Sequence, residues 1–398
     1  MPDEIPDKTA DDLKGEWNYP THIYFGVGEI EKLYDLCGSL NIQNPLLVTD
    51  SGLSKLDIVK NIIDKNNSKG LSIKLFSDVK PNPTEKNIID GVRFYKNNNC
   101  DGVIALGGGS ALDAGKTIAL MVNQKKPLWD FEDIGDNWKR IDSTAIAPCI
   151  AIPTTAGTGS EVGRASVIKD EVTQTKKIIF HPNMLPNLVI CDAQLTQGLP
   201  PNITAATGMD ALVHSLEAYC VNCYHPMADG IALESMRLIK GNLLCAYQNP
   251  DDLSARSQML VASMMGATAF QKGLGGVHAL AHPIGAIYDK HHGLLNAIIL
   301  PYVLIKNKTV IENKIKNIAH FLNFKNNSFD DFMEWILELR INLGIPNDLN
   351  SIGIDLDKSH LIGKLAQKDP TAAGNPIEFS DDQYSEIFKN AVNGNIKE

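Results

Sequence analysis

Side chains of the kinds that bind metal ions cluster in two short segments of the second half of the chain. Four of the ten histidines lie between positions 278 and 292: His278, His282, His291 and His292. His278 and His282 are four residues apart, so a helix would place both on one face. Asp210 and His214 have the same spacing upstream. The chain therefore carries two i,i+4 pairs of ligand-type side chains.

Two such pairs on two helices favour a divalent metal site, because helical domains build these sites from facing helices. A lone histidine on an apolar face is more often an ordinary core residue, but two matched pairs shift the balance towards a metal. The donors are imidazole nitrogens and carboxylate oxygens, which suit Fe(II) or Zn(II). The spacing alone does not choose between these two metals.

A glycine-rich segment, LGGGSALDAGKT at 106–117, follows a short apolar run and opens a helical pattern. Consecutive glycines let backbone N–H groups approach an anion, and a helix N-terminus adds partial positive charge, so a phosphate site is favoured over a simple tight turn. The dinucleotide fingerprint would need glycine at Leu112, and the P-loop of nucleoside triphosphatases would need glycine at Ser110. The segment therefore predicts phosphate binding without matching either motif.

A second loop, PTTAGTGSE at 153–161, also follows an apolar run. Its hydroxyls and glycines suit hydrogen bonds to a cofactor, although an ordinary Ser/Thr turn has the same composition. Asp50 ends another apolar run and is placed to accept hydrogen bonds from a ribose diol, or else to cap a helix. Because a carboxylate there would repel a 2′-phosphate, Asp50 favours NAD over NADP.

The elements that would position these residues differ between the two halves of the chain. The first half alternates β-rich runs with helical patterns, which predicts βαβ units and a parallel sheet with ligands at the carboxyl ends of its strands. The expected strands are 45–50, 73–76, 102–106, 150–152 and 188–190, with helices near 53–66 and 85–97.

After Leu199 the pattern becomes helical almost throughout. The expected helices are 204–221, 227–242, 253–271, 277–288, 310–322, 328–343 and 381–392. We therefore predict an α/β nucleotide-binding domain at 1–198 and an all-helical, metal-binding domain at 199–398.

The charge and composition of the chain limit the kinds of molecule that it is expected to bind. The net charge of −10 argues against a nucleic-acid binder and leaves small molecules as the expected ligands. The amino terminus is polar and acidic rather than basic and then apolar, and the apolar runs are shorter than the ~20 residues that cross a bilayer. Seven cysteines, an odd number, suggest reduced thiols. A soluble cytoplasmic protein that does not bind membranes is expected.

Four motifs in order resemble the iron-containing (group III) alcohol dehydrogenases: 107–113, 153–162, 208–214 and 275–285. The resemblance extends from Pro20 to Pro376. It implies the architecture shared with dehydroquinate synthase, in which NAD(P) and a metal lie in the cleft between an α/β domain and a helical domain. It also implies a homodimer or a larger homo-oligomer.

The resemblance further implies a role for individual residues. One divalent metal, expected to be Fe(II), would be bound by Asp210, His214, His278 and His292, with His282 beside it as a catalytic proton relay. His292 is favoured over its neighbour His291 by the spacing from His278. The cofactor, NAD in preference to NADP, would contact Asp50, Gly107, Gly108, Gly109, Ser110, Asp113, Thr154, Thr155, Thr158 and Lys176.

Two cations, Arg164 and Lys272, fall near motif segments expected to border the active site. They would suit a substrate with a carboxylate, such as an ω-hydroxy acid, although solvated surface charges are an equally good interpretation. The function that follows is hydride transfer between NAD(H) and a primary alcohol, a short hydroxy acid or a diol. The alternatives are a metal- and NAD-dependent lyase or cyclase on the same scaffold and, less favoured, a P-loop nucleoside triphosphatase.

Overall fold

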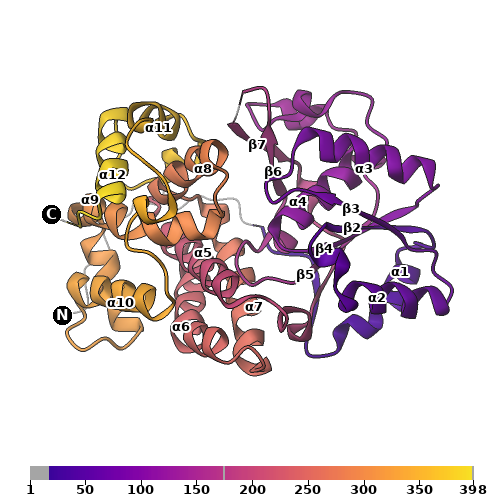
Figure 1. Ribbon diagram of the computed structural model, residues 1–398, viewed down its shortest axis with the longest axis horizontal. Helices are drawn as coiled ribbons and strands as arrows, with labels where there is room; N and C mark the ends of the chain where they lie inside the picture. The colour runs from indigo at the N-terminus through magenta and orange to yellow at the C-terminus, as the bar shows by residue number, and fades with distance from the viewer. Residues whose placement is uncertain (1–17, 174, 397–398) are drawn as a thin grey trace.

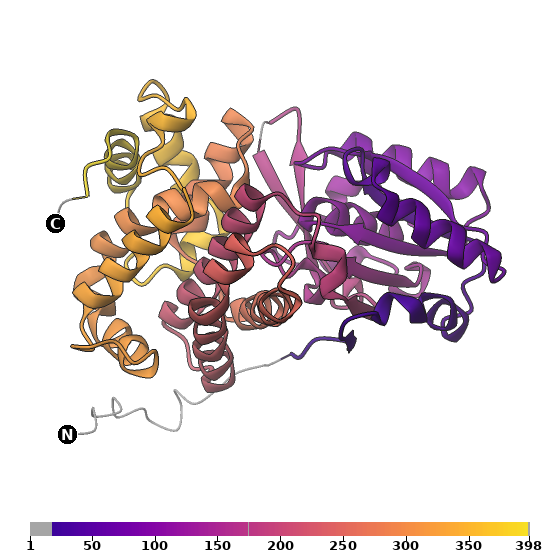
Figure 2. The same ribbon diagram turned by 60° about the horizontal axis from the view of Figure 1, so that its bottom comes forward.

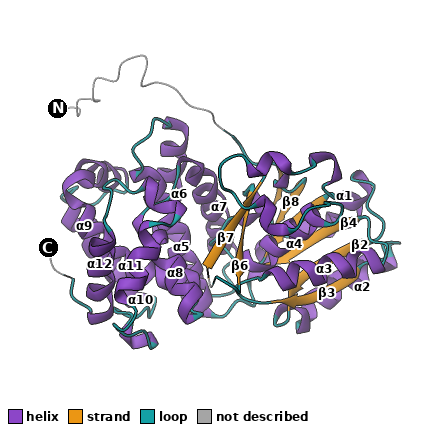
Figure 3. Cartoon of the chain, turned by 90° about the horizontal axis from the view of Figure 1, so that it is seen from above, coloured by secondary structure: helices purple, strands orange, loops and turns teal. Residues whose placement is uncertain are grey.

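The computed structural model describes residues 18–173 and 175–396, which form two halves lying side by side (Figures 1 and 2). The strands lie in the first half and the second half is helical, as Figure 3 shows from above. This confirms the predicted fold class. The acidic amino terminus, from which we expected no export, lies outside the described residues.

The first half is built on a six-stranded sheet in the order β1-β8-β5-β4-β2-β3, with every neighbouring pair parallel. Because all strands run the same way, their carboxyl ends meet at one edge of the sheet, where Gly107 and Pro153 are register partners. The strands are β1 His22–Phe25, β2 Pro45–Asp50, β3 Lys74–Val79, β4 Gly102–Gly107, β5 Cys149–Pro153 and β8 Leu188–Cys191.

Helices cover both faces of this sheet, because alternate residues of each buried strand point to opposite sides. In β4, Val103 and Ala105 belong to the core formed with α3 and α4, whereas Ile104 and Leu106 belong to the core formed with α1 and α2. The helices are α1 Leu33–Ser39, α2 Asp57–Ser68, α3 Glu85–Asn97 and α4 Gly109–Met121.

An antiparallel hairpin of β6 (Ala165–Asp170) and β7 (Thr175–Phe180) was not predicted. Its turn is held by Asp170, whose carboxylate accepts hydrogen bonds from the Val172 N–H and the Thr173 hydroxyl. The hairpin lies between the two halves, and β7 packs against α8 (Figure 1). It therefore belongs to the border between the two halves rather than to the main sheet.

The second half is a helical domain with one large apolar core. Its helix α9 begins at His292, earlier than the predicted Val310, because the helix continues through Pro301. The helices are α5 Pro201–Cys220, α6 Pro226–Gln248, α7 Leu253–Ala269, α8 Gly276–Tyr288, α9 His292–Phe321, α10 Phe329–Asn342, α11 Ser359–Gln367 and α12 Asp381–Asn393.

By length and composition α9 is the one helix among the described residues that could cross a membrane. However, 67% of its most apolar stretch is buried inside the protein. Ile298, Ile299 and Leu300 are fully buried and pack against the other helices of the domain. We therefore interpret α9 as the central helix of this domain's core.

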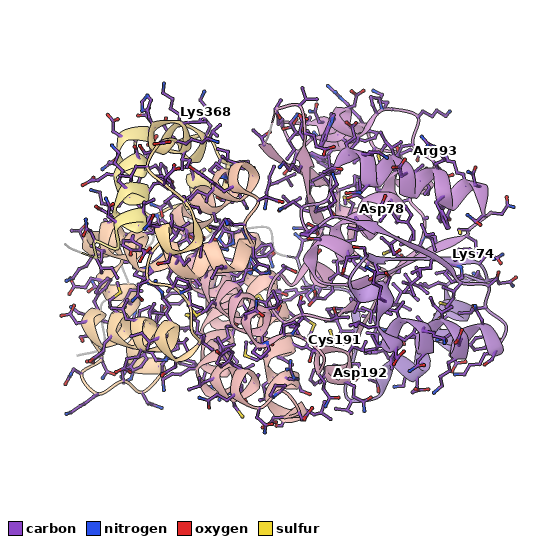
Figure 4. The ribbon with its side chains drawn as sticks, in the orientation of Figure 1. Lys74, Asp78, Arg93, Cys191, Asp192 and Lys368 are labelled. Carbon is purple, nitrogen blue, oxygen red and sulfur yellow. The ribbon has the colours of Figure 1, made fainter. Side chains whose placement is uncertain are left out.

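The predicted domain boundary near residue 198 lies between the end of β8 and the start of α5 at Pro201. Cys191 is the last residue of β8 and Asp192 follows it, where the two halves meet (Figure 4). The Cys191 thiol lies 3.3 Å from the Met264 sulfur on α7, so α7 packs directly against the carboxyl edge of the sheet. The two halves therefore share a packed junction.

A buried lysine contacts the segment between β5 and β6, and a buried glutamate lies within it. The side chain of Lys116 on α4 donates to the carbonyl oxygens of Ser160, Gly163 and Ala165 at 2.9, 3.3 and 2.5 Å. Glu161 is only 1% exposed, and its Oε1 atom has no hydrogen-bond partner among the described residues. Burial raises the pKa of Glu161 from its usual 4.5 to about 7.

The raised pKa of Glu161 predicts a pH-dependent stability. Between pH 4.5 and 7 the folded state binds more protons than the unfolded state, so the free energy of unfolding falls as the pH rises through this window. Glu161→Gln removes this dependence. We expect the stability of the variant relative to the wild type to increase by up to about 3 kcal/mol between pH 4.5 and 8.

Urea unfolding at several pH values measures this difference, with Glu334→Gln on the exposed face of α10 as the matched control. Parallel pH profiles for the wild type and Glu161→Gln would contradict the raised pKa.

Candidate active site

Three imidazole nitrogens surround one carboxylate oxygen in the helical domain. Asp210 and His214 lie on α5, His278 lies in the first turn of α8 and His292 begins α9. The Nε2 atoms of His214, His278 and His292 lie 3.8, 3.9 and 3.7 Å from Asp210 Oδ1. Donor atoms bound to one tetrahedral metal ion with bonds of about 2.1 Å lie about 3.4 Å apart. Each Nε2 atom therefore lies at close to metal-site spacing from the carboxylate, and the ligand atoms of Asp210, His214 and His278 all lie within 4.8 Å of one another.

The Asn296 amide shows what kind of group the cluster favours. Its Nδ2 lies 2.6 Å from Asp210 Oδ1 and 3.1 Å from the Nε2 atoms of both His278 and His292. An amide N–H₂ group donates hydrogen bonds and carries partial positive charge. Asp210 Oδ1 and the two Nε2 atoms therefore direct their lone pairs at the position of Asn296 Nδ2. The donor set, its burial and this convergence fit a divalent cation.

Burial sets the protonation of these histidines. It lowers the pKa of His214 to about 4, and it lowers the pKa of His292 well below 6.5, with the nearby Lys176 charge acting in the same direction. Burial also opposes protonation of His278, but the hydrogen bond and the charge of Glu217 raise its pKa overall. His214 and His292 are thus unprotonated at neutral pH, as metal ligands must be.

Neighbouring groups fix the orientation of two of the rings. His214 Nδ1 lies 3.2 Å from the Gly157 carbonyl oxygen, and His278 Nδ1 lies 2.6 Å from Glu217 Oε2. Since both partners accept hydrogen bonds, each Nδ1 carries a hydrogen and each Nε2 is left to face the cluster. His292 Nδ1 is buried without a partner among the described residues.

His282 and His291, the other two clustered histidines, have different surroundings. His282 stacks on the His292 ring, with ring centres 5.4 Å apart, and its Nδ1 lies 2.9 Å from Asp369 Oδ2. His291 is exposed and caps α9, where its Nδ1 accepts a hydrogen bond from the Leu294 N–H. The structure thus brings His292 into the cluster and leaves His291 outside it.

The two predicted cofactor loops pack against each other at the carboxyl edge of the sheet. A Cβ atom on Gly109 would lie 2.5 Å from the Thr158 side chain, and one on Gly108 would lie 3.3 Å from Thr155. Gly107 has a positive φ of 145° and its carbonyl accepts a hydrogen bond from the Thr154 N–H. Glycine is therefore required at these positions for the close packing of the two loops.

Ser110, Asp113 and Lys116, in or just after the first loop, form hydrogen bonds to other segments of the protein. The Ser110 hydroxyl donates to the Pro81 carbonyl. The Asp113 carboxylate accepts hydrogen bonds from the Ser160 hydroxyl and the Val167 N–H, at 2.5 and 2.9 Å, and so joins α4 to the second loop and to β6. Lys116, the lysine of the near P-loop match, is fully buried against carbonyl oxygens. It cannot contact a nucleotide phosphate, which removes the triphosphatase alternative.

Asp50 and Lys176, two further predicted cofactor contacts, lie on different elements. Asp50 Oδ1 accepts hydrogen bonds from the Gly52 and Leu53 N–H groups, whereas its Oδ2 has no hydrogen-bond partner among the described residues. Lys176 on β7 approaches α8 near Gly285. Burial lowers the pKa of Lys176 to about 8, which the charges of Asp210 and Asp113 partly offset. The neighbouring Lys177 instead pairs with Asp170 and Glu132.

The two predicted substrate cations have protein neighbours. The Arg164 guanidinium lies over the Phe180 ring, 5.5 Å from its centre. Lys272 is buried, forms a 2.5 Å ion pair with Asp229 and donates to the Tyr219 carbonyl at the end of α5. No contact joins either side chain to the metal-ligand cluster in the part of the chain that the structure describes.

Sequence reasoning missed three residues of the site: Glu217, Asn296 and Asp369. Glu217 is three residues after His214, and Asn296 is four after His292, so helical spacing could have identified both. Asp369 lies in a distant segment before α12 and has no local signal.

Comparisons with known proteins agree with this geometry. Residues 20–193 match the family model described as iron-containing alcohol dehydrogenase, and residues 204–392 match the C-terminal model of the Fe-containing alcohol dehydrogenase family. A 4-hydroxybutyrate dehydrogenase from Cupriavidus necator is 35% identical over 384 residues, covering 94% of this chain and 99% of that protein.

Solved structures give the same result. A 1,3-propanediol oxidoreductase has a TM-score of 0.88 and 32% identity, covering 95% of this chain and all of that chain. A sulfoacetaldehyde reductase from Bifidobacterium kashiwanohense in complex with NAD⁺ has a TM-score of 0.86 and 26% identity, covering 95% and 99%. These relatives are oxidoreductases, so the lyase or cyclase alternative has no support. The chain belongs to the iron-containing alcohol dehydrogenase family.

Proposed function

We propose that this oxidoreductase interconverts a short primary alcohol and its aldehyde with NAD(H), using one divalent metal ion held by Asp210, His214, His278 and His292. The observation that carries the proposal is the convergence of three imidazole Nε2 atoms on Asp210 Oδ1. Fe(II) is the expected metal, and Zn(II) suits the same donors.

The first half of the chain would bind the cofactor, and the second half would bind the metal ion. Asp210, His214, His278 and His292 would hold a divalent cation whose charge would make a substrate hydroxyl more acidic, and a bound nicotinamide would supply the hydride acceptor. The glycine loop would orient the cofactor phosphates, and α5, α8 and α9 would fix the oxygen of the substrate relative to the cofactor. Positioning of this kind is the main contribution that a protein makes to a cofactor reaction.

His282 is our proposed group for proton exit. Its ring lies next to that of His292, and its Nδ1 is held by Asp369 at 2.9 Å. Since Asp369 accepts at Nδ1, the Nε2 atom is free to exchange a proton with the substrate side. Asp369 is itself held by the Thr371 N–H and hydroxyl, so the pair is rigidly oriented.

Asp50 is our basis for proposing NAD rather than NADP. Its Oδ1 is engaged in the turn after β2, and its Oδ2 would accept a hydrogen bond from a ribose hydroxyl. A 2′-phosphate at the same place would face a like charge, which disfavours NADP. The remaining predicted cofactor contacts (Ser110, Thr154, Thr155, Thr158 and Lys176) surround the same edge of the sheet.

We further propose a cytoplasmic location and self-association. All seven cysteines are unpaired in the structure, as expected in a reducing compartment. The edge strand β1 has a partner, β8, on one side within the described residues, which leaves its other side for contact with a second copy.

The metal ligands are tested by substitution. Asp210→Asn and His292→Ala should each lose bound metal, measured by elemental analysis, and lower kcat/KM for alcohol oxidation by at least about 100-fold. His291→Ser keeps a capping oxygen at the start of α9 and should retain metal and activity within about threefold. Full activity in rigorously metal-free wild type would contradict the proposal.

The cofactor preference is tested at Asp50. Asp50→Gly removes the carboxylate and should raise kcat/KM with NADP by about tenfold or more while lowering kcat/KM with NAD. Initial rates with each cofactor give the ratio. An unchanged ratio would show that Asp50 serves only as the cap of the turn after β2.

The substrate class is tested with matched panels of n-alcohols, diols and ω-hydroxy acids. Because the names of two relatives contain 4-hydroxybutyrate and 1,3-propanediol, we expect higher kcat/KM for alcohols that carry a second polar end. If Arg164 contacts a carboxylate, Arg164→Ala should lower kcat/KM for hydroxy acids relative to plain alcohols. Unchanged ratios in both Arg164→Ala and Lys272→Ala would remove both cations from the substrate pocket.

A further inference from the structure

The carboxylate of Glu217 links the metal-ligand cluster to the start of helix α8. Glu217 lies on α5, three residues beyond His214, and is 7% exposed. Its two oxygens accept three hydrogen bonds from consecutive parts of α8: the Gly275 N–H at 3.0 Å, the Val277 N–H at 2.7 Å and His278 Nδ1 at 2.6 Å. One side chain therefore holds both the backbone and the ring that present His278.

These contacts replace a cap that α8 lacks. The residue at its N-cap position is Gly275, which has no side chain to accept from the free N–H groups of the first turn. The negative charge of Glu217 also lies at the positive end of the helix, where it is stabilising. The position of His278 within the first turn of α8 thus depends on Glu217.

The contact with the ring determines which nitrogen can bind a metal. An ionised carboxylate only accepts hydrogen bonds, so Nδ1 of His278 must carry the hydrogen. The lone pair then lies on Nε2, the atom that faces Asp210 Oδ1 at 3.9 Å. Hydrogen-bond acceptors behind metal-binding histidines orient the ring and raise its basicity in the same way.

Glu217 lies on the side of His278 that faces away from Asp210. It borders a cavity of about 20 Å³ whose lining includes Leu216, Leu300 and Val303. A cavity of this size is too small for a substrate alcohol with two functional groups. Glu217 therefore acts through His278 rather than on the substrate.

We propose that Glu217 is a positioning residue of the metal centre: it selects the Nδ1–H tautomer of His278 and fixes the α8 turn that aims Nε2 at Asp210. This inference rests on the proposed metal site. It predicts that a change in the hydrogen-bonding chemistry of Glu217, without a change in its size, weakens metal binding.

Asn375 provides the matched control. Its Oδ1 accepts a hydrogen bond from the Gly276 N–H at 3.0 Å, so it supports the same helix end. Its side chain also bonds reciprocally with Asn307 on α9. No contact joins Asn375 to the His278 ring among the described residues, so Asn375→Ala weakens the helix end and leaves the tautomer alone.

Glu217→Gln is the sharpest test, because glutamine has nearly the same size but only one accepting oxygen. If that oxygen faces Val277, the amide N–H₂ faces two hydrogens, on Gly275 and on His278 Nδ1. The conflict at the ring is relieved when the hydrogen moves to Nε2, which then cannot bind a metal. If the oxygen instead faces Gly275 and His278, the amide opposes the Val277 N–H and disturbs the turn.

The measurement is Co(II) binding to metal-free full-length protein, followed by the visible absorption of the bound ion and by competition with a chelator. Glu217→Gln should bind Co(II) about 10- to 100-fold more weakly than the wild type and with an altered spectrum. Asn375→Ala should keep the wild-type spectrum and a dissociation constant within about twofold, with a lower melting temperature.

Equal Co(II) affinity and equal spectra in the wild type and Glu217→Gln would overturn the inference. An equal loss of affinity in Asn375→Ala and Glu217→Gln would also overturn it, because support of the helix end would then be the whole effect. Failure of the wild type itself to bind Co(II) would instead contradict the proposed metal site. The two proposals therefore fail in different ways.

Discussion

The active site depends on one close contact, between the loop after β5 and two helices of the other domain. A Cβ atom on Gly157 would lie within 3 Å of Thr207 on α5, and one on Gly159 would lie 2.1 Å from Ala267 on α7. Only glycine permits this approach, and the Gly159 φ of 60° adds a second reason. The Gly157 carbonyl also contacts His214 Nδ1, so the contact that joins the domains also orients a metal ligand.

The same loop is tied to the sheet domain by polar contacts. Lys116 binds three of its carbonyl oxygens, and Asp113 accepts from Ser160. Both side chains lie on α4, the helix that begins at the glycine loop. A shift of α4 would therefore move both the glycine loop and the residues around His214.

The sequence pattern predicted those helices and strands whose own residues show which side is buried. The strand Pro45–Asp50 and the helix Glu85–Asn97 have the predicted bounds, because the strand is a short buried apolar run that ends in polar residues and the helix has apolar residues at helical spacing. The hairpin β6–β7 was missed because Lys169, Lys176 and Lys177 suggest a solvated segment, whereas its burial comes from packing between domains. The start of α9 was missed because Pro301 and the neighbouring apolar run do not resemble the middle of an amphipathic helix.

The candidate site, like the fold, was predicted in part from the sequence. Asp210 and His214 form one i,i+4 pair and His278 belongs to the other, and the ligand atoms of these three residues lie within 4.8 Å of one another. The supporting carboxylates of Glu217 and Asp369 come from outside these pairs. Glu217 lies three residues after His214 and so on the same helix face, whereas the position of Asp369 beside His282 depends on how distant segments pack against each other.

The order of the contacts along the chain determines when the site can form during synthesis. The strands and the glycine loop are complete before residue 200, so the nucleotide-binding half can begin to fold while the rest is still being made. The cluster needs His292 from α9, and its supports Asp369 and Asn375 come later still. The four predicted ligands are therefore complete only once α9 has been made, and a nascent chain that stalls before α9 lacks His292.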